Sequence, residues 1–219
     1  GAVVEGNALR LDGVNDNAQD PVVSHFNVDT SDFTVSARFY AESQGTDQAI
    51  VRKLNDADTN GFALYRYYSN GFVNFYVGGC SAVASAATGT GEWVDATGVK
   101  KGNTFLLYIN GELKAVGSCV GVDIDNTSPL MIGARYDGTT PFAGLIDEVA
   151  LYNRALSVDE IRRECRRGLK GVTRVFEIHF GGLNTGVDQC VQHEILRGRI
   201  LSQHDSFAAQ VDDVFHVGA

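Results

Sequence analysis

The sequence predicts an all-β fold, a sandwich or jelly roll of two antiparallel sheets, and three observations support this. The 219-residue chain has 25 glycines and only three prolines, which is typical of a turn-rich β protein. Its apolar residues recur mainly with a period of two, in short runs rich in β-branched and aromatic side chains. Asn-Gly dipeptides, which favour hairpin turns, separate several of these runs. Because 44% of the residues are hydrophobic and 21% are charged, the chain has a sizeable core to bury.

Each predicted strand is a short apolar run bounded by turn residues. The runs lie at residues 8–11, 33–40, 49–54, 62–68, 72–77, 93–99, 105–109, 113–116 and 130–134. We expect type I′ hairpin turns at Asn60-Gly61, Asn70-Gly71 and Asn110-Gly111, because Asn and Gly tolerate the two positive φ angles of that turn. We expect the single tryptophan, Trp93, to lie in the core.

One helix is predicted over residues 157–167. Ser157 and Glu160 have the spacing of a capping box, and Gly168 can end the helix in a left-handed conformation. Its apolar residues, Val158, Ile161 and Cys165, form only a narrow stripe. We therefore expect this helix to lie as a lid on the sheets.

The formal charge of -9 argues against general electrostatic binding to nucleic acid or anionic lipid. Residues 154–174 carry seven basic and three acidic side chains, a balance of +4 that leaves −13 for the rest of the chain. We interpret this segment as a solvated helix face, with a docking patch for an acidic neighbour as the alternative. No apolar run approaches the roughly 18 residues that a membrane-spanning helix needs, so no membrane span is expected.

The four cysteines show no zinc-site spacing, and their even number fits two disulfides. Cys80 and Cys119 follow strands in the same half of the predicted sandwich, and Cys165 and Cys190 follow later in the chain. We predict the pairs Cys80–Cys119 and Cys165–Cys190, with four buried free thiols as the alternative. Disulfides would indicate an extracellular, cell-surface or virion-surface location. The chain opens without a signal peptide, and we expect that one has been removed.

Five blocks of sequence, taken together, resemble the laminin-G-like, concanavalin A-like jelly-roll domain. They are GNALRLDGVND (6–16), FTVSARFYAE (33–42), FLLYINGELKAV (105–116), PLMIGAR (129–135) and GLIDEVALYNRALSVDEI (144–161). The last block is the most specific. The resemblance spans residues 6–168 and departs at residues 92–95, where the usual His after the Trp is missing. We therefore expect a jelly-roll domain over residues 1–168 and a C-terminal extension over residues 169–219.

The resemblance implies a non-catalytic, extracellular carbohydrate-binding module, lectin-like or adhesive. Glycosidases of this fold place paired carboxylates on one strand, about 5 Å apart in the retaining class. No such strand occurs here, because Asp147 and Glu148 are adjacent and should face opposite sides. The lyase pattern is also incomplete: Glu177-Ile178-His179 has no Tyr-Lys strand after it. A polysaccharide lyase or glycoside hydrolase remains an alternative function.

Aromatic rings and planar polar groups are what a sugar-binding surface requires. Strand alternation puts Tyr65 and Tyr67 on one face and Arg66 and Tyr68 on the other, so only one of these pairs can line a groove. Half-buried packing is the alternative role for these tyrosines. The candidate ligand-binding residues are Tyr65, Arg66, Tyr67, Tyr68, Tyr76, Arg135 and Tyr136.

A structural Ca²⁺ is the expected cofactor, because loops rich in Asp, Asn and Gly supply the oxygen ligands that calcium prefers. In the family that the chain resembles, the first Asp-Gly turn lies beside the Ile-Asp-Glu strand, which implies that Asp12 and Asp147 share an ion. The alternative is that Asp12 forms an ordinary turn and Asp147 accepts hydrogen bonds from backbone N–H groups. Residues 55–60 also have calcium-loop composition, but a solvated hairpin is the preferred interpretation.

The C-terminal extension is too short to form a second core. Residues 172–180 alternate as a strand and residues 211–217 could form another. A strand with exposed aromatics must add to a sheet, and we expect it to join its own jelly roll. Pairing with a neighbouring copy is the alternative, in which the chain is a structural or assembly protein such as a capsid decoration, fibre or filament subunit.

Overall fold

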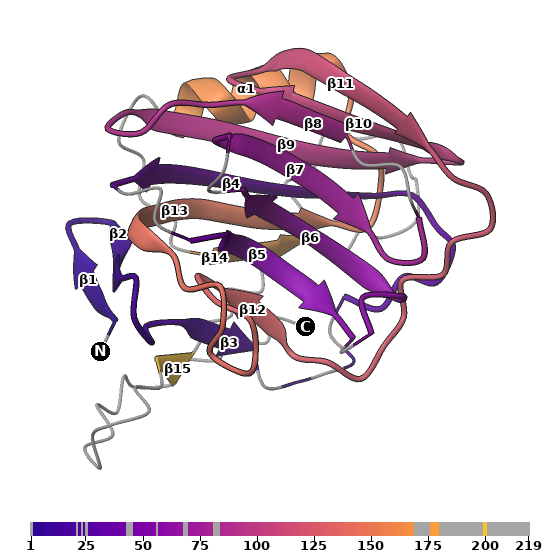
Figure 1. The fold of residues 1–219 in the computed structure, drawn as a ribbon. Helices are drawn as coiled ribbons and strands as arrows, with labels where there is room; N and C mark the ends of the chain where they lie inside the picture. Colours follow the sequence, from indigo (N-terminus) through magenta and orange to yellow (C-terminus); the bar gives the residue numbers. More distant parts are fainter. Residues whose placement is uncertain are drawn as a thin grey trace, which may run out of the picture.

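Two β-sheets stacked face to face make up the body of the protein (Figure 1). The computed structural model describes residues 2–168, apart from residues 21, 23, 25, 43–45, 56, 68–69 and 81–83, together with residues 176–179 and 199–200. Sheet A contains β1 (Val3–Glu5), β2 (Ala8–Asp12), β4 (Phe33–Ala41), β9 (Trp93–Lys101), β10 (Thr104–Ile109), β11 (Glu112–Ser118), β13 (Ala143–Tyr152) and β14 (Phe176–His179). Sheet B contains β3 (Ala18–Asp20), β5 (Gln48–Leu54), β6 (Gly61–Arg66), β7 (Phe72–Val77), β8 (Ala84–Ala87), β12 (Leu130–Ile132) and β15 (Arg199–Ile200).

The strand orders are those of a jelly-roll sandwich. Sheet A runs β1-β2-β13-β4-β9-β10-β11, with β14 paired to β13, and sheet B runs β15-β3-β12-β5-β6-β7-β8. All neighbouring strands pair antiparallel except β13 and β14, which are parallel. The predicted all-β sandwich with one short helix is confirmed.

The core fills the space between the sheets and takes alternate side chains from each strand. Phe33 of β4 contacts Phe62 of β6 and Phe75 of β7, with ring centroids 5.1 and 5.9 Å apart. Gly98 of β9 lies against Phe75, and a Cβ added there would stand 2.3 Å from the ring. The two sheets therefore approach so closely at this point that only glycine fits.

Of the three Asn-Gly predictions, only that at Asn110-Gly111 is correct. Both residues have positive φ, 52° and 76°, and Ile109 pairs directly with Glu112 across them. The other two predictions are wrong, because Leu54 pairs with Gly61 and Arg66 pairs with Val73. Longer connections therefore join β5 to β6 and β6 to β7, and neither Asn-Gly dipeptide stands alone as a two-residue turn.

Helix α1 (Val158–Gly168) packs on the outer face of sheet A (Figure 1). The prediction that this helix lies as a lid on the sheets is confirmed. Ile161 joins Leu156, Tyr108 and Tyr152 in a small apolar cluster between helix and sheet. The capping box is also confirmed: the backbone N–H of Ser157 donates to Glu160 at 2.8 Å, and that of Glu160 donates to the Ser157 hydroxyl at 3.4 Å. Within the described residues, no helix is long and apolar enough to cross a membrane.

The predicted Cys80–Cys119 disulfide is present and connects the end of β7 to the end of β11, so it joins the two sheets. The predicted partner of Cys165, Cys190, lies outside the described residues. Strand β14 falls inside the predicted strand of residues 172–180, and it adds to β13 of its own chain. The possible strand at residues 211–217 lies outside the described part.

Candidate functional site

Three tyrosines gather on the outer face of sheet B, which we call the tyrosine face. Tyr65 of β6 and Tyr76 of β7 alternate with core residues and so point away from the sandwich. The ring of Tyr65 lies 5.0 Å from that of Tyr67 and 6.5 Å from that of Tyr76, and both contacts are edge-to-face. The hydroxyl of Tyr65 also bonds that of Tyr67 at 3.2 Å. The tyrosines thus present aromatic surface and hydroxyl groups together.

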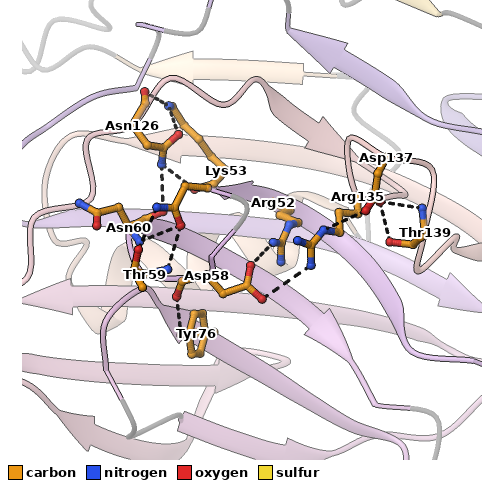
Figure 2. Close-up of polar contacts among 11 residues, drawn as sticks. Arg52, Lys53, Asp58, Thr59, Asn60, Tyr76, Asn126, Arg135, Asp137 and Thr139 are labelled. Carbon is orange, nitrogen blue, oxygen red and sulfur yellow. Dashed lines mark hydrogen bonds and ion pairs between the residues drawn. The ribbon is translucent and has the colours of Figure 1, made fainter.

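A charged cluster lies next to Tyr76 (Figure 2). Arg52 of β5 and Arg135, which follows β12, both reach Asp58 in the β5–β6 hairpin. Arg52 contacts Oδ1 of Asp58, and Nη1 of Arg135 lies 3.7 Å from Oδ2. The hydroxyl of Tyr76 donates to the backbone carbonyl of Asp58 at 2.7 Å. A single hairpin residue therefore connects the tyrosines to both arginines.

Strand register explains why these groups meet. Arg52, Ala63 and Tyr76 are direct partners across β5, β6 and β7, so all three share the outer face. The small side chain of Ala63 separates the arginine from the tyrosine. Asp58 has a φ of 56°, which bends the hairpin back over this row of residues.

The hairpin is fixed by Asn55. Its side-chain carbonyl accepts the backbone N–H groups of Thr59 and Asn60 at 2.8 and 3.1 Å. Asn126 supports the hairpin from the other side, donating to the carbonyls of Lys53 and Asn60 (Figure 2). Hydrogen bonds from the side chains of Asn55 and Asn126 to the backbone thus hold the hairpin that carries Asp58.

Burial raises the pKa of Tyr65 well above its ordinary range, and the hydrogen bond with Tyr67 raises it further. Burial also raises the pKa of Tyr76. Both hydroxyls therefore stay protonated at neutral pH and can donate and accept hydrogen bonds.

The predicted ligand residues divide into three groups. Tyr65, Tyr67 and Tyr76 come together, and Arg135 lies beside them with its Cζ 5.9 Å from the ring of Tyr136, which is 41% exposed. The prediction for Arg66 is wrong, because this residue shares the inward side of β6 with Leu64 and is fully buried. Its Nη2 donates to the carbonyls of Thr88 and Gly89 at 3.4 Å. Tyr68 lies outside the described residues.

Three members of the cluster are not among the predicted ligand-binding residues: Arg52, Asp58 and Asp137. Arg52 had a signal, since it is one of two charged residues, with Lys53, in the strand run AIVRKL. Asp58 was assigned to a solvated hairpin, and its contact with Arg135 depends on how that hairpin folds. Asp137 accepts hydrogen bonds from Thr139 and lies 3.4 Å from Nε of Arg135, and its Asp-Gly context predicts only a turn.

The structure does not bring the predicted calcium ligands together. Asp12 pairs with Ala143, four residues before Asp147 on β13, so their backbones lie roughly 14 Å apart at strand spacing. Calcium binds oxygens at about 2.4 Å, so the two carboxylates cannot share an ion. Instead, Asp12 accepts from the N–H of Val14 and Asp147 from that of Glu148, both at 2.8 Å. Among the described residues, no three His, Cys, Asp or Glu side chains form a group suited to a metal ion.

The outer face of sheet A, which we call the helix face, carries a second polar cluster. The core prediction for Trp93 is wrong: it lies half-buried on this face, with its ring 5.2 Å from Cζ of Arg38 and 5.8 Å from Tyr40. Asp95 accepts from the Cys165 thiol of α1 at 3.4 Å and lies 3.8 Å from Nη1 of Arg38. Burial raises the pKa of Asp95 despite the nearby arginine.

A cavity of about 30 Å³ lies within this cluster, beside α1. Its lining includes Arg38, Asp95, Thr97, Glu148 and Cys165. This volume holds about one or two water molecules, which is far below that of a sugar pocket. The helix face therefore offers polar groups but little room.

Comparison with known proteins identifies the family. The chain belongs to the concanavalin A-like lectin/glucanases superfamily, whose family model matches residues 12–162. No curated protein sequence matches the chain.

Solved structures share the fold at low sequence identity. A native heptameric SAP-like pentraxin from Limulus polyphemus is 16% identical, with a TM-score of 0.58 over 80% of this chain and 88% of that chain. A CBM40 from a Ruminococcus gnavus IT-sialidase, bound to α2,3-sialyllactose, is 18% identical, with a TM-score of 0.57 over 74% and 98%. A Trypanosoma rangeli sialidase is 18% identical, with a TM-score of 0.63 over 78% of this chain and 29% of that chain. At these identities the similarity establishes a common fold.

Proposed function

We propose that this chain is a non-catalytic carbohydrate-binding module whose tyrosine face binds glycan. The observation that carries the proposal is the cluster of Tyr65, Tyr67 and Tyr76 beside Arg52 and Asp58, on the side of the sandwich opposite α1. Sugar rings stack on aromatic surfaces, and their hydroxyls bond to planar polar groups around them. The named ligand of the Ruminococcus gnavus CBM40, a sialylated trisaccharide, supports carbohydrate as the class of ligand.

The chemistry of the tyrosine face supports binding without catalysis. A retaining glycosidase needs a nucleophile and an acid about 5 Å apart, each accessible to the sugar. Here both oxygens of Asp58 are engaged by Arg52 and Arg135, and Asp137 is engaged by Thr139 and Arg135. Neither carboxylate is arranged to transfer a proton to a substrate.

The Cys80–Cys119 disulfide supports a secreted or surface location, because such bonds persist in oxidising compartments. Calcium remains a separate proposal without assigned ligands, since Asp12 and Asp147 do not fit a shared ion. None of the proposed sugar contacts involves a metal ion. Binding should be measured with added calcium and with a chelator, to separate the two proposals.

A glycan array followed by titration calorimetry on the best-binding oligosaccharide tests the function. Tyr67→Ala removes the most exposed ring of the cluster, which is 38% exposed, and should weaken binding at least about 10-fold. Tyr40→Ala is the matched control, because Tyr40 is a tyrosine of the helix face and should leave affinity unchanged.

Absence of binding to every glycan, or equal losses in the two variants, would contradict the proposal. Release of reducing sugar or of an unsaturated product from a bound polysaccharide would show that the protein is an enzyme and would contradict the non-catalytic function.

A further inference from the structure

The charges of the tyrosine face cancel one another. Arg52 and Arg135 bring two guanidinium groups, and Asp58 and Asp137 bring two carboxylates in contact with them. An arginine cluster that captured anionic ligands would instead leave its guanidinium groups with an excess of positive charge. This face therefore lacks the charge that an acidic ligand requires.

A further carboxylate lies close to the tyrosines. Burial and the hydrogen bond to Tyr67 raise the pKa of Tyr65, and the negative charge of Asp47 adds to the effect. Asp47 thus acts electrostatically on the aromatic part of the face. Asp47 therefore adds negative potential near the tyrosines, within a chain whose formal charge is -9.

Asp58 is also the most accessible charge at the centre of the cluster. Its side chain is 43% exposed, whereas those of Arg52 and Arg135 are 12% and 23% exposed. A ligand that approaches this point meets the carboxylate of Asp58 before it meets either guanidinium group. An acidic sugar that paired with the arginines would have to displace Asp58 from them and leave that carboxylate unpaired beside its own negative charge.

We propose that the tyrosine face selects uncharged oligosaccharides, and that Asp58 excludes acidic sugars by occupying both arginines. This selectivity rests on the proposed function and adds the class of glycan to it. Neutral sugar hydroxyls both donate and accept hydrogen bonds, so they suit a surface of tyrosine hydroxyls and paired charges. The exposed carboxylate of Asp58 also disfavours acidic sugars, because like charges brought together at a binding surface oppose association.

Paired glycans that differ mainly in charge test the selectivity of the native chain. Galactohexaose is compared with hexagalacturonate, and lactose with α2,3-sialyllactose, on the same array and then by calorimetry. In each pair for which binding is measurable, we expect the neutral glycan to bind at least tenfold more tightly than the acidic glycan. Preferential binding of the acidic members would overturn the selectivity while leaving the proposed function in place. Failure to bind any glycan on the array would overturn the proposed function itself.

Asp58→Asn tests the role assigned to Asp58. Asparagine has nearly the same shape and tolerates the φ of 56° at this position. The substitution releases Arg52 and Arg135, so binding of hexagalacturonate should strengthen at least tenfold. Asp159→Asn on α1 makes the same change in net charge on the opposite side of the sandwich, where Asp159 is 90% exposed, and should change nothing. Equal effects of the two variants, or no gain with Asp58→Asn, would overturn the role of Asp58.

Salt dependence gives a second measurement that does not rely on the variant folding. Binding of a neutral oligosaccharide to the native chain should change by less than twofold between 50 and 500 mM NaCl, conditions chosen because screening weakens contacts between charges. A steep loss of affinity over that range would show that unpaired charges carry the binding, and it would contradict the proposal.

Discussion

The two outer faces of the sandwich carry similar residues but differ in what covers them. The helix face has Trp93, Tyr40, Arg38 and Asp95, a set that would suit a sugar as well as that of the tyrosine face. Helix α1 packs on this face, and its Cys165 thiol bonds Asp95. Helix α1 thus covers the part of this face around Asp95, whereas among the described residues no helix packs on the tyrosine face.

The two faces also use their aspartates differently. Asp95 sits on a strand, between Arg38 and the helix, and burial raises its pKa. Asp58 sits in a hairpin and keeps 43% of its side chain exposed while it contacts two arginines. The first arrangement fixes the helix to the sheet, and the second presents a charge to ligands.

The largest expected effect comes from the contact between α1 and the helix face. Ile161 is 2% exposed and belongs to the cluster that joins α1 to sheet A. Ile161→Ala should lower the free energy of unfolding by about 3 kcal/mol, through lost burial and the cavity it leaves. Urea unfolding followed by circular dichroism measures this change.

Val158→Ala is the control on the same helix, since Val158 is 40% exposed and should lose less than about 0.5 kcal/mol. Both folded variants should bind glycan as the native chain does. A loss of glycan affinity in Ile161→Ala under conditions where it is fully folded would contradict the division between the faces.

An intermediate effect is expected from Lys53, which follows Arg52 on β5. Its Nζ donates to two oxygens of Asn126 and to the carbonyl of Ser128, all at 3.2 Å, and the side chain is fully buried. Burial lowers the pKa of Lys53 to about 8, although Asp125 and Asp20 favour the charged form.

The unfolded chain therefore binds this proton more tightly than the folded chain, and stability should rise with pH between about 8 and 10.5. For Lys53 alone the gain is about 2 kcal/mol from pH 8 to pH 10. Lys53→Met should show a correspondingly flatter profile in urea titrations across this range. Parallel profiles for the native chain and the variant would show that Lys53 has an ordinary pKa.

The smallest effect is expected at the start of α1. Arg154 bonds Glu160 at 2.8 and 3.1 Å, and this contact, together with the capping bonds from Ser157, lowers the pKa of Glu160 to about 2. The stabilisation is fully present above the ordinary pKa of glutamate and is lost as pH falls through about 4 toward 2. Solvent screening limits it to about 1 kcal/mol.

Glu160→Gln should remove that contribution at pH 7 and reduce the difference from the native chain at pH 2. Thermal unfolding at the two pH values measures both quantities. An equal difference at pH 7 and at pH 2 would contradict the assignment to the ionised Glu160.

The sequence was sufficient for most of the longer strands and for part of the site, because these features depend on neighbouring residues. Alternation along β6 places Tyr65 and Tyr67 on one face regardless of how the rest of the chain folds. The capping box at Ser157 likewise needs only neighbouring residues. Alternation does not say which of the two faces is buried. Trp93 was therefore assigned to the core and Arg66 to a possible groove, and the structure reverses both.

Contacts between distant segments could not be predicted in this way. Arg52, Asp58 and Arg135 meet because a hairpin of particular shape turns back over β5 and a loop after β12 ends beside it. The expected turn at Asn60-Gly61 would have placed Asp58 within a strand. The calcium pair failed for a related reason, since the register of β2 and β13 separates Asp12 from Asp147 by four positions.

The claim that the tyrosine face is the binding face is tested most directly by mapping a bound oligosaccharide on the chain with ¹H–¹⁵N NMR. The ligand is the neutral glycan that binds best on the array, titrated into the native protein. We expect chemical-shift changes centred on Tyr65, Tyr67, Tyr76 and Asp58, with the signals of Tyr40, Trp93 and Asp95 unchanged. Chemical-shift changes centred on Trp93 and Asp95, without changes on the tyrosine face, would contradict binding at the tyrosine face.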